Sequence, residues 1–202
     1  MRRKTEERRL KFVMAAGKLF MDQGFAAVTM ESIAMEAASS KVTLYSYFSS
    51  KESLFEAYVV EAGRGLVERL LDAPTCSQAL PDILHRLGMS YLELVTKPDI
   101  VALNRLIIGE AGRFPELARL FYAEGPKRTL SHISQVMEGL MAKGLIRQTE
   151  TRMVSLHFKE LCGAGTVERI IWGLDPVPAE TEVLEAAVAN GVQAFIRLYS
   201  NS

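Results

Sequence analysis

The side chains best suited to specific chemistry lie in one short stretch near the start of the chain, residues 40–51. An ammonium can donate to guanine O6 and N7, hydroxyl groups can bond to base edges, and an apolar side chain can touch the methyl group of thymine. Groups of these types fall together at the front of the stretch. We predict that four of them contact the bases of DNA: Lys41, Val42, Thr43 and Tyr45.

The elements that position this stretch have the pattern of a helix-turn-helix. Residues 29–37 are predicted to form a short helix, Ala38 and Ser39 a tight turn, and residues 40–48 a second short helix. In this motif the second helix lies in the major groove and presents its N-terminal residues to the bases. Leu44 and Phe48 share the opposite face of that helix and are predicted to be core.

Polar residues around the motif are suited to the DNA backbone, because helix N-termini and basic side chains bind phosphates. We predict phosphate contacts from Thr29, Ser40, Tyr47 and Lys51, and from a basic arm that includes Arg3 and Lys4. Other roles stay open: Thr29 as a helix cap only, Tyr47 as an aromatic cover on the core and Lys51 as a solvated lysine. The arm is equally compatible with an ordinary solvated terminus.

Composition and charge favour a globular protein with one basic end. Of the 202 residues, 49% are hydrophobic and 24% are charged, which is typical of a folded chain. Residues 1–51 hold nine Lys and Arg against five Asp and Glu, a net charge of +4, although the whole chain is neutral. A basic first quarter suits a protein with one end facing nucleic acid. We expect no membrane span and no secretory signal, and therefore a cytoplasmic protein.

No group of residues suggests catalysis. The three histidines, His85, His132 and His157, lie apart from any Cys or acidic cluster with the spacing of metal ligands. Cys76 and Cys162 lack a C-x-x-C spacing, which favours idle thiols in a reducing compartment over a redox sensor. We therefore expect no enzyme activity, no metal and no cofactor.

Beyond the motif the chain is a series of predicted helices without a strand. A first helix over residues 5–23 precedes the motif, and a connecting helix runs from Lys51 to about Leu71. Further helices are predicted over residues 77–96, 99–112, 114–143 with a proline kink, 151–173 and 179–199. The predicted fold class is all-α, with about nine or ten helices. A three-helix head occupies residues 1–51 and a larger helical domain residues 52–202.

Residues 10–55 resemble the head of the TetR family of bacterial transcriptional regulators. The resemblance rests on F-V-M-A-A-G-K-L-F-M-D-Q-G-F, on T-M-E-S-I-A and above all on T-L-Y-S-Y-F-S-S-K-E-S-L-F. Ala38 and Val42 depart from the family, which usually has glycine at the first position and often at the second. A positive φ at Ala38 would cost about 1 kcal/mol. A later run, R-L-I-I-G-E-A-G-R-F-P-E-L-A-R-L-F-Y-A-E-G-P, resembles the sensor half of one subgroup of the same family.

The resemblance implies a homodimeric regulator of double-stranded DNA, a repressor that a small-molecule effector releases from a palindromic operator. For the effector pocket we name five candidates, each of which also suits plain core: Arg105, Phe114, Phe121, Phe158 and Trp172. For a dimer face on the last two long helices we name six: Gly163, Val167, Ala187, Val188, Gly191 and Phe195.

Two alternatives stay open. Both apolar stripes of the last two helices are compatible with their own core rather than a second copy. The chain is also compatible with a helical ligand-binding or scaffolding protein whose helix-turn-helix has degenerated, a hypothesis supported only by Ala38 and Val42.

Overall fold

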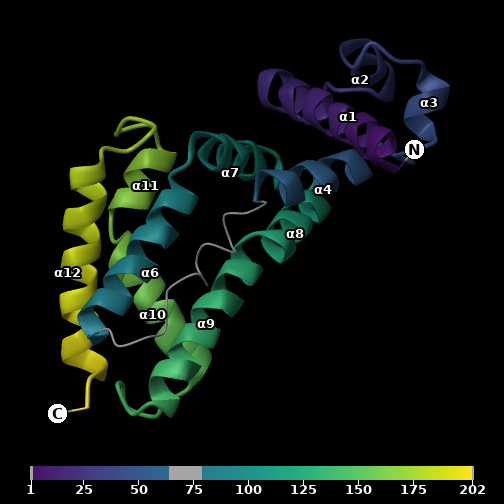
Figure 1. The fold of residues 1–202 in the computed structure, drawn as a ribbon. Coiled ribbons are helices and arrows are strands. Elements are labelled where there is room, and N and C mark those ends of the chain that lie inside the picture. Colours follow the sequence, from purple (N-terminus) through teal and green to yellow (C-terminus); the bar gives the residue numbers. More distant parts are fainter. Residues whose placement is uncertain (1, 64–78, 202) are drawn as a thin grey trace. The chain divides into compact units, whose positions relative to one another are not determined.

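A computed structural model describes the backbone of residues 2–63 and 79–201, and the side chains of residues 5–63 and 79–201. Within these residues the chain is built from helices, and no strand occurs; an isolated bridge pairs Ile146 with Ser200 (Figure 1). The predicted all-α fold is therefore confirmed. None of the described helices is long and apolar enough to cross a membrane.

The chain forms two compact units, and each of them uses two separate stretches of sequence. Unit 1 comprises Met1–Gly63 and Ala102–Gly125, whereas unit 2 comprises Arg64–Val101 and Pro126–Ser202. This division differs from the predicted boundary between residues 51 and 52. The predicted domains, a DNA-binding head over residues 1–51 and a ligand-binding and dimerisation domain over residues 52–202, stay a prediction.

Unit 1 contains the predicted helix-turn-helix. Its helices are α1 (Arg2–Gln23), α2 (Met30–Glu36), α3 (Lys41–Tyr45), α4 (Lys51–Ala62), most of α7 (Pro98–Glu110) and α8 (Pro115–Glu124). One hydrophobic cluster joins Phe20, Leu44 and Phe55 to Leu103 and Phe121. Residues 102–125 therefore complete the core beneath the helix-turn-helix.

Helices α1 and α4 of unit 1 approach one another closely at Gly17. A Cβ atom on Gly17 would lie 2.2 Å from Cε2 of Tyr58, far inside the ordinary contact distance of about 3.5–4.0 Å between carbon atoms. The Tyr58 ring belongs to the buried cluster of unit 1. Packing thus explains why a residue with poor helix propensity stands in the middle of α1.

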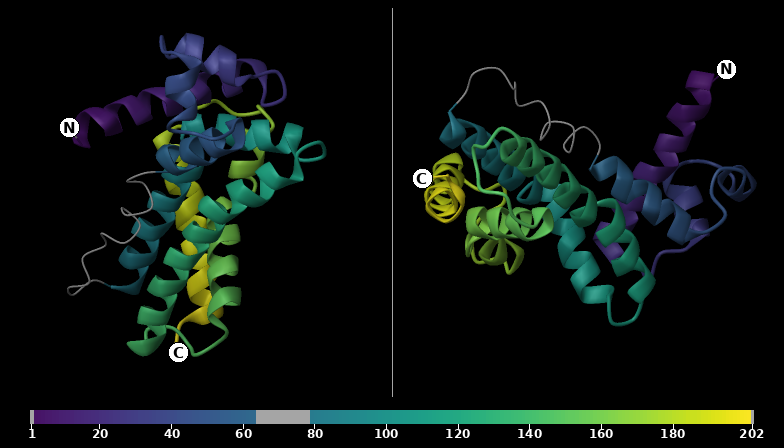
Figure 2. Two further views of the ribbon diagram at one scale, coloured as in Figure 1. Left: turned by 90° about the vertical axis from the view of Figure 1, so that its right-hand side faces the viewer. Right: turned by 90° about the horizontal axis from the view of Figure 1, so that it is seen from below.

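Unit 2 is a bundle whose core runs from α6 to α12. Its helices are α6 (Leu80–Val95), the first turn of α7, α9 (Pro126–Ala142), α10 (Thr151–Gly163), α11 (Thr166–Ile171) and α12 (Thr181–Tyr199). Helix α12 runs alongside α6 and α10, and α10 also packs on α9 (Figure 2). Leu84, Met137, Phe158 and Phe195 lie in the shared hydrophobic cluster.

Two predicted helices differ from the observed ones. The helix predicted over residues 151–173 is broken after Gly163, because Gly165 has a φ of 76° that a helix cannot continue through. The basic arm predicted before the first helix is wrong for the backbone, since α1 already begins at Arg2. The side chains of Arg3 and Lys4 lie outside the described residues, as do Cys76 and the predicted end of the connecting helix beyond Gly63.

Candidate nucleic-acid interface

In the turn of the helix-turn-helix, Ala38 adopts the positive φ that the sequence analysis considered for it. Ala38 has a φ of 46°, in the left-handed region where an L-residue with a Cβ is strained. Ala38 N donates to Met35 O, and Ser39 N donates to Ala34 O, each at 2.9 Å. The turn therefore closes the end of α2 with hydrogen bonds while holding an alanine where glycine would be easier.

Helix α3 is held at both its start and its buried face. Ser40 is its N-cap, and its Oγ accepts from Thr43 N at 3.1 Å and lies 2.8 Å from Thr43 Oγ1. Leu44 and Phe48 are buried in the cluster of unit 1, which confirms their predicted core role. The cap and the buried side chains fix which face of this short helix is turned to solvent.

The solvent face of α3 presents the four residues predicted to contact bases. Val42 is 82% exposed and Tyr45 is 46% exposed, Lys41 is also exposed, and Thr43 is half-buried. Val42 lies outside the hydrophobic cluster of unit 1, so its methyl groups are free to meet another surface. Contact between these side chains and DNA bases stays a prediction.

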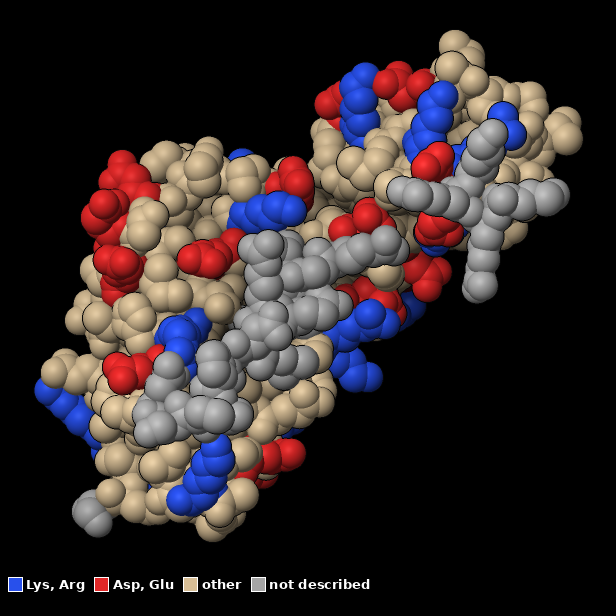
Figure 3. All heavy atoms as spheres, viewed as in Figure 1, with Lys and Arg blue, Asp and Glu red and all other residues tan. Residues whose placement is uncertain are grey.

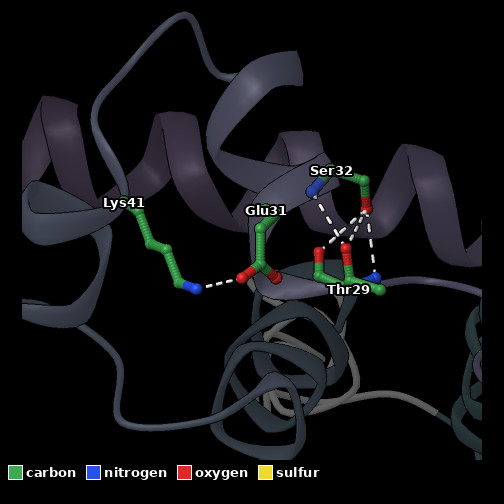
Figure 4. A network of polar contacts seen from close by, with 4 residues as sticks. All are labelled: Thr29, Glu31, Ser32 and Lys41. Atoms are coloured by element: carbon green, nitrogen blue, oxygen red, sulfur yellow. Dashed lines mark hydrogen bonds and ion pairs between the residues drawn. The ribbon is translucent and has the colours of Figure 1, made fainter.

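Lys41 is paired with an acidic residue that the sequence analysis missed. Its Nζ donates to Glu31 Oε1 at the start of α2, and it lies 5.8 Å from the centre of the Tyr45 ring (Figure 4). The hydrogen bond to Glu31 raises the pKa of Lys41, and the same bond lowers the pKa of Glu31. Both groups are thus charged near neutral pH. The only sequence signal was an acid in the first turn of α2, where the helix dipole favours one.

Thr29 forms a reciprocal cap with Ser32 at the start of α2. Thr29 Oγ1 accepts from Ser32 N at 3.1 Å, and Ser32 Oγ accepts from Thr29 N at 3.1 Å (Figure 4). This arrangement is a capping box, and it confirms Thr29 as an N-cap. Ser50 and Ser53 form a second capping box at the start of α4.

Two residues predicted to contact phosphate make intramolecular contacts. The half-buried Tyr47 ring packs on Phe12 with 5.5 Å between ring centres. Lys51 Nζ donates to the carbonyl oxygens of Phe25 at 2.9 Å and Val28 at 3.2 Å. Phosphate contacts by Tyr47, Lys51, Thr29 and Ser40 stay predictions.

Charge is mixed rather than concentrated on the face drawn in Figure 3. On the face drawn in Figure 3, Lys and Arg alternate with Asp and Glu over both units. In unit 1 two of the lysines are paired with acids, since Lys18 lies 2.6 Å from Glu36 and Lys41 pairs with Glu31. The net charge of the first 51 residues therefore does not appear as one continuous basic patch on that face.

The five residues predicted for an effector pocket are divided between the units. Arg105, Phe114 and Phe121 belong to unit 1, whereas Phe158 and Trp172 belong to unit 2. The Phe121 and Phe158 side chains are buried in the hydrophobic clusters of their own units, and Trp172 is 69% exposed. The pocket stays a prediction.

Three of the six residues predicted for a dimer face are buried within the single chain. Val188, Gly191 and Phe195 are buried inside unit 2, and a dimer contact by them stays a prediction. A Cβ on Gly191 would lie 2.8 Å from Cα of Cys162, which shows that α12 and α10 touch backbone to backbone there. The apolar stripe of α12 is wide enough for two partners, and the sequence could not tell which part faces its own core. Gly163, Val167 and Ala187 are half-buried and stay predictions.

Burial also settles the state of one cysteine. Cys162 is a free, fully buried thiol, and burial raises its pKa to about 12. No group of three or more His, Cys, Asp or Glu side chains within the described parts of the chain is arranged to hold a metal ion.

Comparison with known proteins supports a regulator over nearly the whole chain. Residues 13–58 match the model of bacterial regulatory proteins of the tetR family, and residues 82–201 match the C-terminal domain of AefR-like transcriptional repressors. The structure of the flavonoid-responsive regulator FrrA is 32% identical with a TM-score of 0.84, and the alignment covers 96% of this chain and 98% of that one.

More distant relatives agree on the fold or on the head alone. A putative TetR-family regulator from Mesorhizobium loti is 24% identical with a TM-score of 0.85, covering 97% of this chain and 98% of that one, which shows the fold. The transcriptional activator FasR of Mycolicibacterium smegmatis is 44% identical over 52 residues, 26% of this chain but only 24% of its own length. The chain thus belongs to the TetR family of bacterial regulatory proteins, as a DNA-binding transcriptional regulator with a helix-turn-helix head and not as an enzyme.

Proposed function

We propose that this regulator binds a palindromic operator as a homodimer and represses transcription until a small-molecule effector weakens the binding. The observation that carries the proposal is the solvent face of α3, where Lys41, Val42 and Tyr45 are exposed while Leu44 anchors the helix in the core. Two-fold symmetry would place the two α3 helices in successive major grooves, roughly 34–36 Å apart. Repression is favoured because the matching C-terminal family is that of AefR-like repressors.

Within this proposal, Lys41, Val42, Thr43 and Tyr45 read bases, whereas Thr29, Ser40 and Tyr47 contact the backbone. Glu31 accepts from one of the three N–H donors of Lys41, so the ion pair holds the ammonium on the α3 face while leaving donors for a guanine. Val42 favours a thymine methyl group, since it offers no hydrogen bond. The proposed operator half-site therefore contains a guanine next to a thymine-bearing step.

The test is binding to the DNA upstream of the gene, measured by gel shift at several salt concentrations. Lys41→Ala should change base preference at one position of each half-site. Lys18→Ala is the matched control, because Lys18 also pairs with a glutamate in unit 1 but belongs to α1. A uniform loss of affinity for all sequences in Lys41→Ala would show that Lys41 contacts phosphate instead. Absence of any salt-sensitive, palindrome-dependent complex would overturn the proposed operator.

The dimer is proposed to form through the exposed edge of α12. One face of α12 carries five residues at helical spacing that are half-buried or exposed, four of them apolar and one an amide. They are Val183, Ala187, Asn190, Ala194 and Leu198. Val183 is 44% exposed and Leu198 is 51% exposed, which leaves apolar surface at both ends of the row for a second copy to cover. The two alanines, half-buried nearer the middle, would allow two copies of α12 to approach closely.

The effector is proposed to be recognised inside unit 2, at polar atoms that lack a partner. Among the described residues, Arg86 Nε and Nη2 and His132 Nδ1 are buried without a hydrogen bond. Native proteins rarely leave such groups unsatisfied. A ligand with oxygen acceptors and an apolar body would satisfy the two Arg86 donors, and the flavonoid-responsive FrrA makes a flavonoid the first class to try.

Thermal melting with and without quercetin tests this assignment. Arg86→Met should raise the melting temperature of the free protein, because it removes two buried N–H groups that lack a hydrogen bond, and should abolish the shift caused by ligand. Arg169→Met is the control, since Arg169 is exposed and already paired with Asp175. A lower melting temperature in Arg86→Met without ligand would show that the guanidinium is satisfied within the protein.

A further inference from the structure

Lys51, the first residue of α4, is enclosed by the turn that joins α1 to α2. Its Nζ donates to Phe25 O at 2.9 Å, Val28 O at 3.2 Å and Ala26 O at 3.5 Å. It also lies 4.4 Å from the centre of the Phe25 ring. An ammonium has three N–H donors, and here each has a carbonyl acceptor within the same short turn.

The same turn is also contacted by the last residue of α7, Glu110, and by the N-cap of α8, Phe114. Ala26 N donates to Glu110 Oε1 at 3.4 Å. The Phe114 ring meets the Phe25 ring edge to face, with 5.3 Å between centres, and lies 6.0 Å from Lys51 Nζ. Residues 24–28 are therefore contacted both by Lys51 at the start of α4 and by Glu110 and Phe114, all within unit 1.

We infer that Lys51 is a positioning residue that fixes the α1–α2 turn, and not a phosphate contact. The turn leads directly into Thr29, the N-cap of α2, so its position determines where α2 begins and hence where α3 is placed. Reaching a phosphate would require Lys51 to give up three carbonyl acceptors and the face of Phe25. This role differs from the one that the family resemblance suggested.

The proposal explains why the contacts of this turn combine a cation with two aromatic rings and a carboxylate. Carbonyl oxygens and ring faces are both negative, so the Lys51 ammonium satisfies them together. Glu110 Oε1 accepts from Ala26 N in the same turn. A guanidinium is wider and planar and does not fit a cradle of three converging carbonyls, so arginine is a poor substitute for lysine here.

The two roles predict different behaviour for Lys51→Met and Lys51→Arg in the full-length protein. As a positioning residue, Lys51 should be irreplaceable by either, and both variants should melt roughly 4 °C or more below the wild type. The slope of log affinity against log salt should stay unchanged in Lys51→Met. As a phosphate contact, Lys51→Arg should behave like the wild type, and Lys51→Met should reduce the slope by about 2 for the two copies in a dimer.

Lys18→Met is the matched control for melting, because this exposed lysine of unit 1 has only a single ion pair. It should leave the melting temperature nearly unchanged. Wild-type melting of Lys51→Arg together with a reduced salt slope in Lys51→Met would overturn the inference. If Lys51→Met does not fold, the arginine variant decides alone. The melting arm uses no DNA, so its outcome is independent of whether the proposed operator is correct.

Discussion

Substitution of Gly17 by alanine tests the closest contact in unit 1. The added Cβ would lie 2.2, 2.3 and 2.8 Å from three atoms of the Tyr58 ring, so the ring must move by more than about 1 Å. Tyr58 is buried within the cluster and has little room to do so. Overpacking of this kind costs about 1–3 kcal/mol. The better helix propensity of alanine offsets this by stabilising the folded protein by about 1 kcal/mol.

The expected net effect is a loss of about 1 kcal/mol of unfolding free energy, or roughly 2–4 °C in melting temperature. Gly139→Ala in α9 is the matched control, because nothing lies within 4 Å of its added Cβ. There the propensity gain acts alone and stability should rise by about 1 kcal/mol. Urea denaturation followed by far-ultraviolet circular dichroism measures both.

A Gly17→Ala variant that gains as much stability as Gly139→Ala would refute the packing argument, because it would mean that α1 and α4 leave room for a Cβ. A double variant makes the test sharper. Combining Gly17→Ala with Tyr58→Leu removes the colliding ring atoms, so the two changes together should cost less than the sum of their separate costs.

Three other positions each predict a measurable outcome. Ala38→Gly should stabilise the protein by about 1 kcal/mol in the same urea assay, because it relieves a φ of 46°; an unchanged midpoint would contradict this. Cys162 should resist iodoacetamide in mildly alkaline buffer in the folded protein, as judged by mass spectrometry of its peptide, since its pKa is raised to about 12. Unfolding free energy should then fall as the pH rises above about 8.5, where the unfolded thiol ionises and the folded one does not. Leu198→Glu, on the exposed edge of α12, should give a monomer in sedimentation analysis while Glu185→Ala leaves the dimer intact; a dimer in both would refute the proposed interface.

Local signals in the sequence were sufficient for the helix-turn-helix. Thr29 and Ser50 each precede a helix with a serine three residues later, and both form the caps that this spacing favours. Leu44 and Phe48 were assigned to the core from their shared face on a short helix, and both are buried. These features depend on neighbours within one turn of helix, which the sequence displays directly.

Features that depend on distant parts of the chain could not be predicted. Lys51 finds its acceptors 23 to 26 residues away, and Glu110 bonds to Ala26 across 84 residues. Periodicity identified the apolar stripe of α12 but could not show that Val188 and Phe195 are buried in the core of unit 2. The break at Gly165 was missed because the small residues at positions 163–165 suit close packing between helices as well as the end of a helix.

The discontinuous build of unit 1 limits how such regulators can exchange parts. A hybrid that joined residues 1–63 to a foreign effector domain would carry the whole surface proposed to contact DNA. It would lack Leu103, Ile107, Leu117 and Phe121, which complete the hydrophobic cluster beneath that surface. A working graft must therefore bring residues 102–125 along or offer an equivalent apolar surface. The residues proposed to read the operator and those proposed to bind the effector thus lie in units built from interleaved segments. Recombination at a single crossover point would divide one of these units.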